Sequence, residues 1–283
     1  MASDASVVER TWKLPQALFA SLPWYDLPEI RDANDALWDA IAAALRDQGL
    51  ADVPKMLDRA LPYGFDWNGR CLFTQTCGYP IFTTSRGHFR VIAVPAYAAD
   101  GCDGPLHRSF IVVRKGSRFG SLEDLRDGVF AVNEPDSNSG MNLPRHLFAP
   151  LNREGRFFRA RIVSGSHVAS AELVRDGAAD AAAIDCVTFA LLQRHRPHAI
   201  AELSIIAHSA ATPAPPFVTS SRTDMATFEA IRRALPVVMR DPRYAALRNE
   251  LFLADVVLAD ADAYAVVFEL EREAQRLGYP ILA

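Results

Sequence analysis

The stretch Val129-Phe-Ala-Val-Asn-Glu-Pro-Asp-Ser-Asn-Ser-Gly-Met-Asn142 decides the predicted fold. Its first four residues have the apolar character of a buried strand, and the polar remainder leads into a helix whose first turn contains Pro144. A junction of this kind directs backbone N–H groups at one point, where the positive end of the helix dipole also favours negative charge. The stretch therefore predicts an α/β unit with a candidate anion site.

Small polar residues in this junction supply further hydrogen-bond donors. Ser137, Ser139 and Asn142 carry hydroxyl or amide groups, and Gly140 lets a ligand approach the backbone closely. Ser139 or Asn142 can equally act as an ordinary helix cap. The loop alone thus leaves two interpretations open, an anion site and a cap.

A second junction, Ser164-Gly-Ser-His167, joins a predicted strand to a helix that ends before Gly177. In open α/β sheets such junctions face one crevice at the carboxyl ends of the strands. His167 can donate from a ring nitrogen, and Asp185, at the end of the strand 181–184, can accept from a ligand hydroxyl or amine. An ordinary helix residue and a structural hydrogen bond are the alternatives for these two side chains.

Strands and helices alternate on both sides of these junctions, which predicts an α/β fold. A helix is expected at 29–48, where apolar residues recur at helical spacing before Gly49. Further strands are expected at 18–22, 71–75, 90–94, 109–113, 161–163 and 204–207, and further helices at 224–239, 242–253 and 260–277.

Two crossings rich in polar residues, proline or glycine, near 100–108 and 208–217, separate a central block from the chain ends. We expect lobe 1 to comprise 14–105 together with 210–283, and lobe 2 to comprise 106–209. Lobe 1 then offers Tyr25 and Tyr79, each of which combines a phenolic O–H with an apolar wall for a small organic group. Either tyrosine can instead be part of the core.

Composition excludes several classes of function. The 283 residues include 30 Lys and Arg against 34 Asp and Glu, a net charge of −4, so the chain lacks the basic excess expected for nucleic acid. Four cysteines stand without a CxxC pair, so we predict neither a metal nor a cofactor and leave their disulfide state open. No G-x-S-x-G, Walker or HExxH motif occurs. The alternative that remains is an enzyme that uses Cys77 or His167 with Asp185.

The first residues do not form a basic segment followed by an apolar run, so no export signal is visible. We therefore expect a cytoplasmic location for the chain as written, with a periplasmic one as the alternative. No apolar segment is long enough to insert into a membrane.

The motifs at 76–80, 133–142, 164–167 and 178–185, in this order, resemble the phosphate, phosphite and phosphonate-binding proteins of ABC importers. The resemblance covers about Leu18 to Phe189 and implies a type 2 periplasmic-binding fold: two α/β lobes joined by two hinge crossings, which close on a ligand like a venus flytrap. Family members often have Thr where this chain has Asn138, and most carry an export signal or a lipoprotein cysteine.

The resemblance also implies roles for individual residues. Ser137, Asn138 and Ser139 would hold the oxygens of a phosphonate-like group, and His167 would add a donor. Tyr25 and Tyr79 would cover the ligand, and Asp185 would contact its variable end.

We therefore predict a monomeric solute-binding protein for a small anion, working with an ABC permease or as an intracellular carrier or sensor. An enzyme on the same scaffold is the second hypothesis. The effector domain of a regulator is the third, although no helix-turn-helix precedes the fold.

Overall fold

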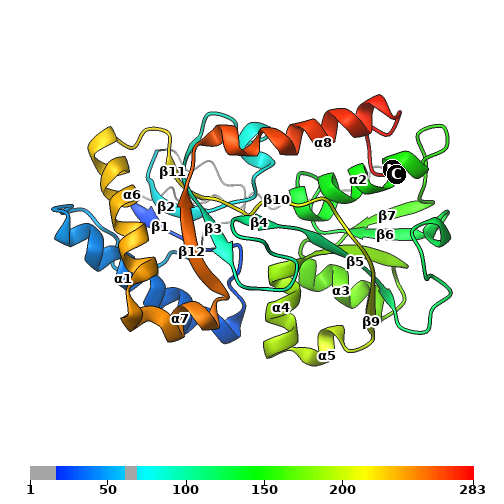
Figure 1. The fold of residues 1–283 in the computed structure, drawn as a ribbon, viewed down its shortest axis with the longest axis horizontal. Helices are drawn as coiled ribbons and strands as arrows, with labels where there is room; N and C mark the ends of the chain where they lie inside the picture. The colour runs from blue at the N-terminus through cyan, green and yellow to red at the C-terminus, as the bar shows by residue number, and fades with distance from the viewer. Residues whose placement is uncertain (1–16, 61–68) are drawn as a thin grey trace, which may run out of the picture.

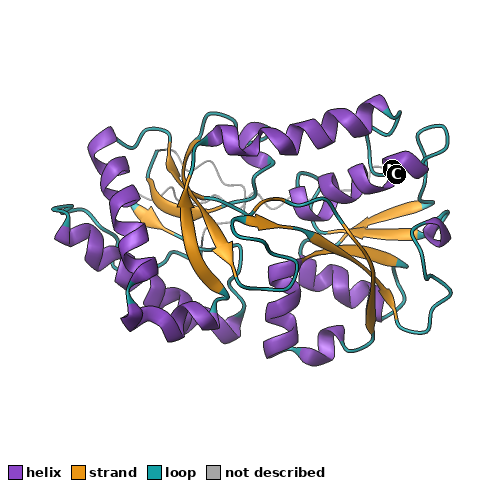
Figure 2. Ribbon diagram, viewed as in Figure 1, coloured by secondary structure: helices purple, strands orange, loops and turns teal. Residues whose placement is uncertain are grey.

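A computed structural model describes residues 17–60 and 69–283 as two lobes that lie side by side, each built on a five-stranded sheet (Figure 1). Helices cover the faces of both sheets (Figure 2). This arrangement confirms the predicted α/β class.

The first sheet has the strand order β1-β2-β11-β3-β12. Its strands are β1 (Phe19–Ala20), β2 (Cys71–Gln75), β11 (Phe217–Ser220), β3 (Phe89–Tyr97) and β12 (Leu253–Leu258), and its helices are α1 (Arg31–Asp47), α6 (Met225–Arg240) and α7 (Ala245–Glu250). The rings of Trp38 and Phe217 both pack on Phe73, with centroids 5.8 and 5.1 Å away. These buried aromatic residues join α1 to the strands of the sheet.

The second sheet has the order β7-β6-β8-β5-β9. Its strands are β7 (Ala160–Val163), β6 (Val129–Val132), β8 (Ala181–Asp185), β5 (Ser109–Arg114) and β9 (Leu203–His208), with helices α2 (Leu143–Phe148), α3 (His167–Arg175), α4 (Cys186–His195) and α5 (Pro197–Ile200). Strand β6 is parallel to both of its neighbours, β7 and β8. The junctions after these three strands therefore meet at one edge of the sheet, as the sequence predicted.

Two chain crossings connect the sheets and pair with each other. β4 (Leu106–His107) and β10 (Thr212–Pro213) form an antiparallel two-stranded ribbon between the lobes (Figure 1). This ribbon confirms the predicted pair of hinge crossings.

The last helix, α8 (Ala265–Arg276), runs from the first lobe along α2 of the second (Figure 1). The carbonyl oxygen of Ala283 accepts hydrogen bonds from the backbone N–H groups of Phe157 and Phe158, at 2.7 and 3.0 Å. The lobe boundaries at 14–105 with 210–283 and at 106–209 stay a prediction.

Several elements were not expected from the sequence, among them the strands β11 and β12 and the helices α4 and α5. The helix expected at 242–253 is also shorter, because a 3₁₀ turn (Pro242–Tyr244) precedes α7 and Leu253 already belongs to β12. Both unexpected strands pair with β3, far away in sequence, so local patterns carry little trace of them. Among the described residues, no helix is both long and apolar enough to span a membrane.

Candidate functional site

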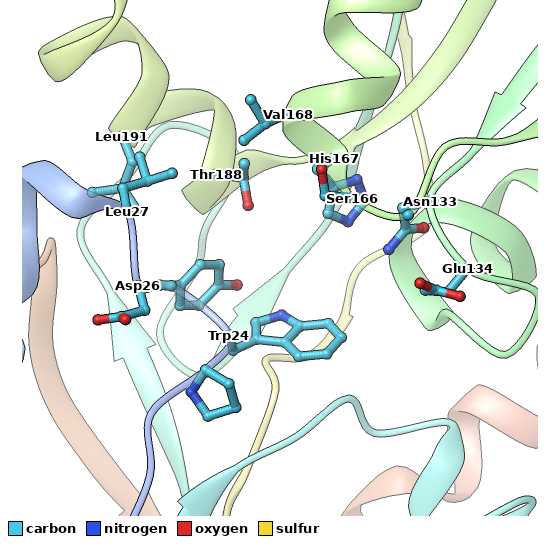
Figure 3. Close-up of a pocket in the computed structure, with 13 residues that line it drawn as sticks. Trp24, Asp26, Leu27, Asn133, Glu134, Ser166, His167, Val168, Thr188 and Leu191 are labelled. Atoms are coloured by element: carbon cyan, nitrogen blue, oxygen red, sulfur yellow. The ribbon is translucent and has the colours of Figure 1, made fainter. Parts of the chain in front are cut away.

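A cavity of about 270 Å³ lies between the lobes, where both predicted strand-to-helix junctions meet the loop after β1 (Figure 3). The second lobe contributes residues that follow β6 and β7 and residues of α4, and the first lobe contributes the loop 23–27. Its lining consists of Pro23, Trp24, Tyr25, Asp26, Leu27, Asn133, Glu134, Gly165, Ser166, His167, Val168, Thr188 and Leu191.

The two junctions are joined by a hydrogen bond between Ser139 and His167. Ser139 Oγ lies 2.8 Å from His167 Nε2, and both side chains are buried. Nδ1 of His167 lies 3.1 Å from the carbonyl oxygen of Ala183, which can only accept, so Nδ1 carries a hydrogen. Burial lowers the pKa of His167, and the neutral ring then accepts the Ser139 hydroxyl hydrogen at Nε2.

The first junction forms a π-helical turn, Asn138–Asn142, that continues into α2. Ser137 caps this turn, because its Oγ accepts from the N–H of Gly140 at 3.0 Å. The N–H of Asn138 donates to Cys77 Sγ of the opposite lobe at 3.2 Å. The sequence predicted that the backbone N–H groups of this junction face the anion. The N–H of Asn138 instead points to the other lobe, where the Cys77 thiol accepts its hydrogen bond.

The side chains of Asn138 and Asn142 make contacts within the protein. Asn138 Nδ2 donates to Thr212 Oγ1 of the hinge strand β10 at 3.0 Å. Asn142 Nδ2 donates to Asn138 Oδ1 at 3.0 Å and to the carbonyl oxygen of Val267 at 3.1 Å. Its Oδ1 accepts from Arg145. These two amides therefore connect the junction to the hinge and to α8.

Gly140 packs closely against Asn133. A Cβ atom at Gly140 would collide with Asn133 Oδ1 and would lie 3.3 Å from His167 Cε1. The same Oδ1 is buried, with no hydrogen-bond partner in the described part of the chain. Position 140 therefore requires glycine because the Asn133 side chain leaves no room for a Cβ atom. The sequence had predicted a different reason, the close approach of a ligand to the backbone.

Asp185 is fully buried, and protein groups surround its carboxylate. Oδ1 accepts from the Tyr25 hydroxyl at 3.0 Å and from the Thr188 N–H at 2.9 Å, and Oδ2 lies 2.7 Å from His107 Nδ1. Burial opposes the ionised form of Asp185, but the charge and hydrogen bond of His107 hold its pKa below the ordinary value. Asp185 thus links hinge strand β4 and the first lobe to the end of β8.

His107 was not selected from the sequence. Burial alone would lower its pKa, but the hydrogen bond that His107 donates to Asp185 and the negative charge of Asp185 raise the pKa above the ordinary value. A lone histidine in a short polar crossing gives no signal of such a partner, because 78 residues separate the two.

Of the site residues predicted from the sequence, Tyr25 and His167 line the cavity. The residues outside its lining are Ser137, Asn138, Ser139, Gly140, Asn142, Asp185 and Tyr79. The Tyr79 hydroxyl donates to Glu271 Oε1 on α8 at 2.7 Å, and its ring stacks on Phe268 with centroids 5.9 Å apart. The structure therefore brings Tyr25, His167, Ser139 and Asp185 together and places Tyr79 beside α8.

Trp24 and Glu134 were also missed as lining residues. In Figure 3 the indole of Trp24 lies across the cavity between Asp26 and Glu134. Burial and the charge of Asp136 raise the pKa of Glu134. Their signal in the sequence was position alone, since each lies two residues after the end of a predicted strand.

Within 17–60 and 69–283, no cluster of three metal-ligating side chains occurs. The four cysteines are free thiols. Burial raises the pKa of Cys77 to about 11, which disfavours the thiolate needed for nucleophilic attack.

Comparison with known proteins gives one family match. Residues 72–264 match the sequence model of the family described as "ABC transporter, phosphonate, periplasmic substrate-binding protein". The search of curated protein sequences found no match.

Several solved structures share the fold. A binding-protein component of an ABC phosphonate transporter from Pseudomonas aeruginosa is 18% identical, with a TM-score of 0.74 over 93% of this chain and 88% of that chain. PhnD1 from Prochlorococcus marinus, in complex with methylphosphonate, is 16% identical, with a TM-score of 0.72 over 93% and 99%. XAC2383 from Xanthomonas citri, bound to ATP, is 17% identical, with a TM-score of 0.70 over 93% and 98%. These similarities confirm the predicted two-lobed fold.

Proposed function

The chain belongs to the family of periplasmic substrate-binding proteins of phosphonate ABC transporters, and from this premise we propose that it binds a phosphonate or a related small oxyanion between its lobes. The observation that carries this proposal is the contact of Ser139 with His167 beside a cavity that both lobes line. Two junctions thereby present hydroxyl, imidazole and backbone groups in one place.

In the proposed complex, the oxygens of the anion contact Ser137, Asn138, Ser139 and the backbone at Gly140. His167 adds a hydrogen bond. A bound anion favours the protonated ring, so His167 changes from acceptor to donor when the ligand arrives. Tyr25 covers the ligand from the hinge side, and Asp185 accepts the hydrogen bond of its hydroxyl. Asn142 and Tyr79 support the junction through α8.

We propose binding without covalent chemistry. Cys77 is buried with a raised pKa, and His167 Nδ1 faces the carbonyl oxygen of Ala183, not a carboxylate that would make it a strong base. An enzyme that relies on Cys77 would lose turnover in Cys77→Ala. A receptor with this substitution should keep its ligand affinity within about tenfold, or 1.4 kcal/mol.

The family description also supports a periplasmic location and an ABC permease as partner. We propose that the protein works there as a monomer that delivers its ligand by closing and reopening about the β4–β10 ribbon. The expected cytoplasmic location has no support in the family description.

Isothermal titration calorimetry tests the proposal. Purified protein would be titrated with methylphosphonate, 2-aminoethylphosphonate, phosphite, phosphate and, as a non-phosphorus control, sulfate. At least one phosphorus compound should bind with a stoichiometry of one, and more tightly than sulfate. Heats that show no binding by any of them at millimolar concentration would contradict the proposal.

A further inference from the structure

Two cysteines that the binding site does not use lie in contact beside the hinge. Cys102 Sγ is 3.4 Å from Cys186 Sγ, although 84 residues separate them in sequence. Cys102 belongs to the crossing between β3 and β4, and Cys186 begins α4 directly after Asp185. The thiol pair thus lies where the first crossing leaves lobe 1 and meets the second sheet.

Hydrogen bonds through Arg108 connect the backbone next to Cys102 with the backbone of Cys186. The N–H of Cys186 donates to the carbonyl oxygen of Arg108 at 3.0 Å, and Arg108 Nε donates to the carbonyl oxygen of Gly101 at 3.1 Å. Gly101 has a φ of +88°, and a Cβ there would lie only 3.0 Å from Cys186 Cβ. Cys102 therefore cannot move far from Cys186 without breaking this packing.

We propose that Cys102 and Cys186 form a disulfide that fixes the first hinge crossing to the second lobe. The sulfurs need to approach by only about 1.4 Å to reach the length of an S–S bond. The family description places its members in the periplasm, an oxidising compartment in which such bonds persist.

The oxidation proceeds by exchange with a protein or glutathione disulfide. The partly exposed Cys102 loses its proton and attacks one sulfur of that disulfide, which stays bonded to Cys102 as a mixed disulfide. The donor S–S bond breaks, and the other donor sulfur leaves as a thiolate. Cys186 then loses its proton and attacks Cys102 Sγ, which expels the second thiolate. Two protein thiols are oxidised, and the donor disulfide is reduced to two thiols.

The other two cysteines serve as internal controls. Cys71 lies buried in β2, and Cys77 Sγ accepts the Asn138 N–H. Burial raises the pKa of both thiols. The hydrogen bond with Cys102 and burial raise the pKa of Cys186 as well, so the difference lies in geometry. Cys102 and Cys186 are the two cysteines of the described residues whose sulfurs are in contact, so neither Cys71 nor Cys77 is expected to form a disulfide under conditions that oxidise this pair.

Thiol counting by mass spectrometry tests the proposal. The protein is incubated in oxidised glutathione, denatured and alkylated with N-ethylmaleimide, and its intact mass is compared with that of a sample reduced before alkylation. We expect two labelled cysteines in the oxidised sample and four in the reduced one, with a tryptic peptide that links Cys102 to Cys186. Four labelled cysteines in both samples, or a linkage to Cys71 or Cys77, would overturn the proposal.

Stability supplies a second readout. A cross-link over 84 residues should raise the melting temperature of the oxidised protein by roughly 5 to 10 °C over the reduced form. Cys102→Ser, at a partly exposed position, should remove this difference, while Cys71→Ala should keep it. If oxidation joined the pair without raising the melting temperature, the crossing would not be fixed by the bond and the proposed role would be wrong.

Discussion

The hydroxyl of Ser139 and the Nε2 atom of His167 lie 2.8 Å apart, although they belong to junctions that follow two different strands. Because β6 and β7 are parallel neighbours, their carboxyl ends place both side chains at one edge of the second sheet. This contact therefore unites the two motifs that the sequence offered separately.

Ser139→Ala tests whether this pair binds the ligand. The substitution should weaken binding of the best phosphorus compound by about 1.5 to 3 kcal/mol, roughly 10- to 150-fold, because a buried anion loses a donor. Titration calorimetry measures the change. Ser170→Ala is the matched control, since its buried hydroxyl contacts Ser164 Oγ at 2.7 Å within the same lobe. Equal affinities in both variants would mean that Ser139 only supports His167.

The two tyrosines should respond differently to removal of the hydroxyl. Tyr25→Phe takes a donor from Asp185 at the cavity and should weaken ligand binding by about 1 kcal/mol or more. Tyr79→Phe removes the bond to Glu271 and should lower the unfolding free energy by about 1 kcal/mol, with affinity unchanged within about twofold. Parallel calorimetry and urea unfolding distinguish the effects, and a reversed pattern would show that Tyr79 contacts the ligand.

Gly140→Ala should lower the melting temperature, because the new methyl group collides with Asn133 Oδ1. Adding Asn133→Ala to this variant removes the side chain that the new methyl group would meet. The double variant should therefore recover part of the lost melting temperature. A thermal double-mutant cycle measures this coupling, which we expect to exceed about 0.5 kcal/mol. If the effects of the two substitutions were additive, contact with Asn133 would not be the reason why position 140 requires glycine.

The pair His107 and Asp185 should make stability depend on pH. The raised pKa of His107 stabilises the fold. This contribution is fully present when the pH is below 6.5, the ordinary pKa of histidine, and is lost as the pH rises through the raised pKa. The lowered pKa of Asp185 stabilises the fold above 3.8, and this contribution is lost as pH falls through the lowered pKa. The pair is therefore most effective between pH 3.8 and 6.5.

His107→Asn isolates this contribution. Near pH 6 it should cost about 3 to 5 kcal/mol, because it leaves a buried carboxylate without its cation, and the difference from the unsubstituted protein should shrink above pH 6.5. The lowered pKa of His167 acts in the opposite sense, since stability falls below pH 6.5 as the unfolded ring gains a proton, but both proteins share it. Urea unfolding from pH 5 to 9 gives the comparison, with His146→Asn as a surface control. A difference that does not vary with pH would show that His107 is uncharged in the fold.

The sequence predicted the second sheet well because its strands are continuous apolar runs that end at polar junctions. Val129–Val132 of this sheet was predicted with the bounds that the structure has, as was Cys71–Gln75 of the first sheet. Leu253–Leu258 was missed, because its pairing with β3 is formed by residues more than 150 positions earlier. Local periodicity cannot reveal a strand whose stability depends on such a distant neighbour.

The candidate site shows the same division. The sequence selected Ser139 and His167 because each stands in a polar junction after a predicted strand, and the structure places the two side chains in contact. The sequence did not select His107 and gave no role of their own to Trp24 and Asn133, because their contacts form across the hinge or between loops. Partners far away in sequence cannot be read from a single chain.

The thiol of Cys77 already accepts the hydrogen bond of the Asn138 N–H. An anion that accepts a hydrogen bond from this N–H must first displace the Cys77 sulfur. Its observed affinity is therefore the free energy of the new hydrogen bond minus that of the Asn138–Cys77 contact. Weak acceptors such as sulfur yield readily to a charged oxygen but poorly to a neutral one. In the proposed complex, this contact would therefore favour charged ligands over neutral ones of the same shape.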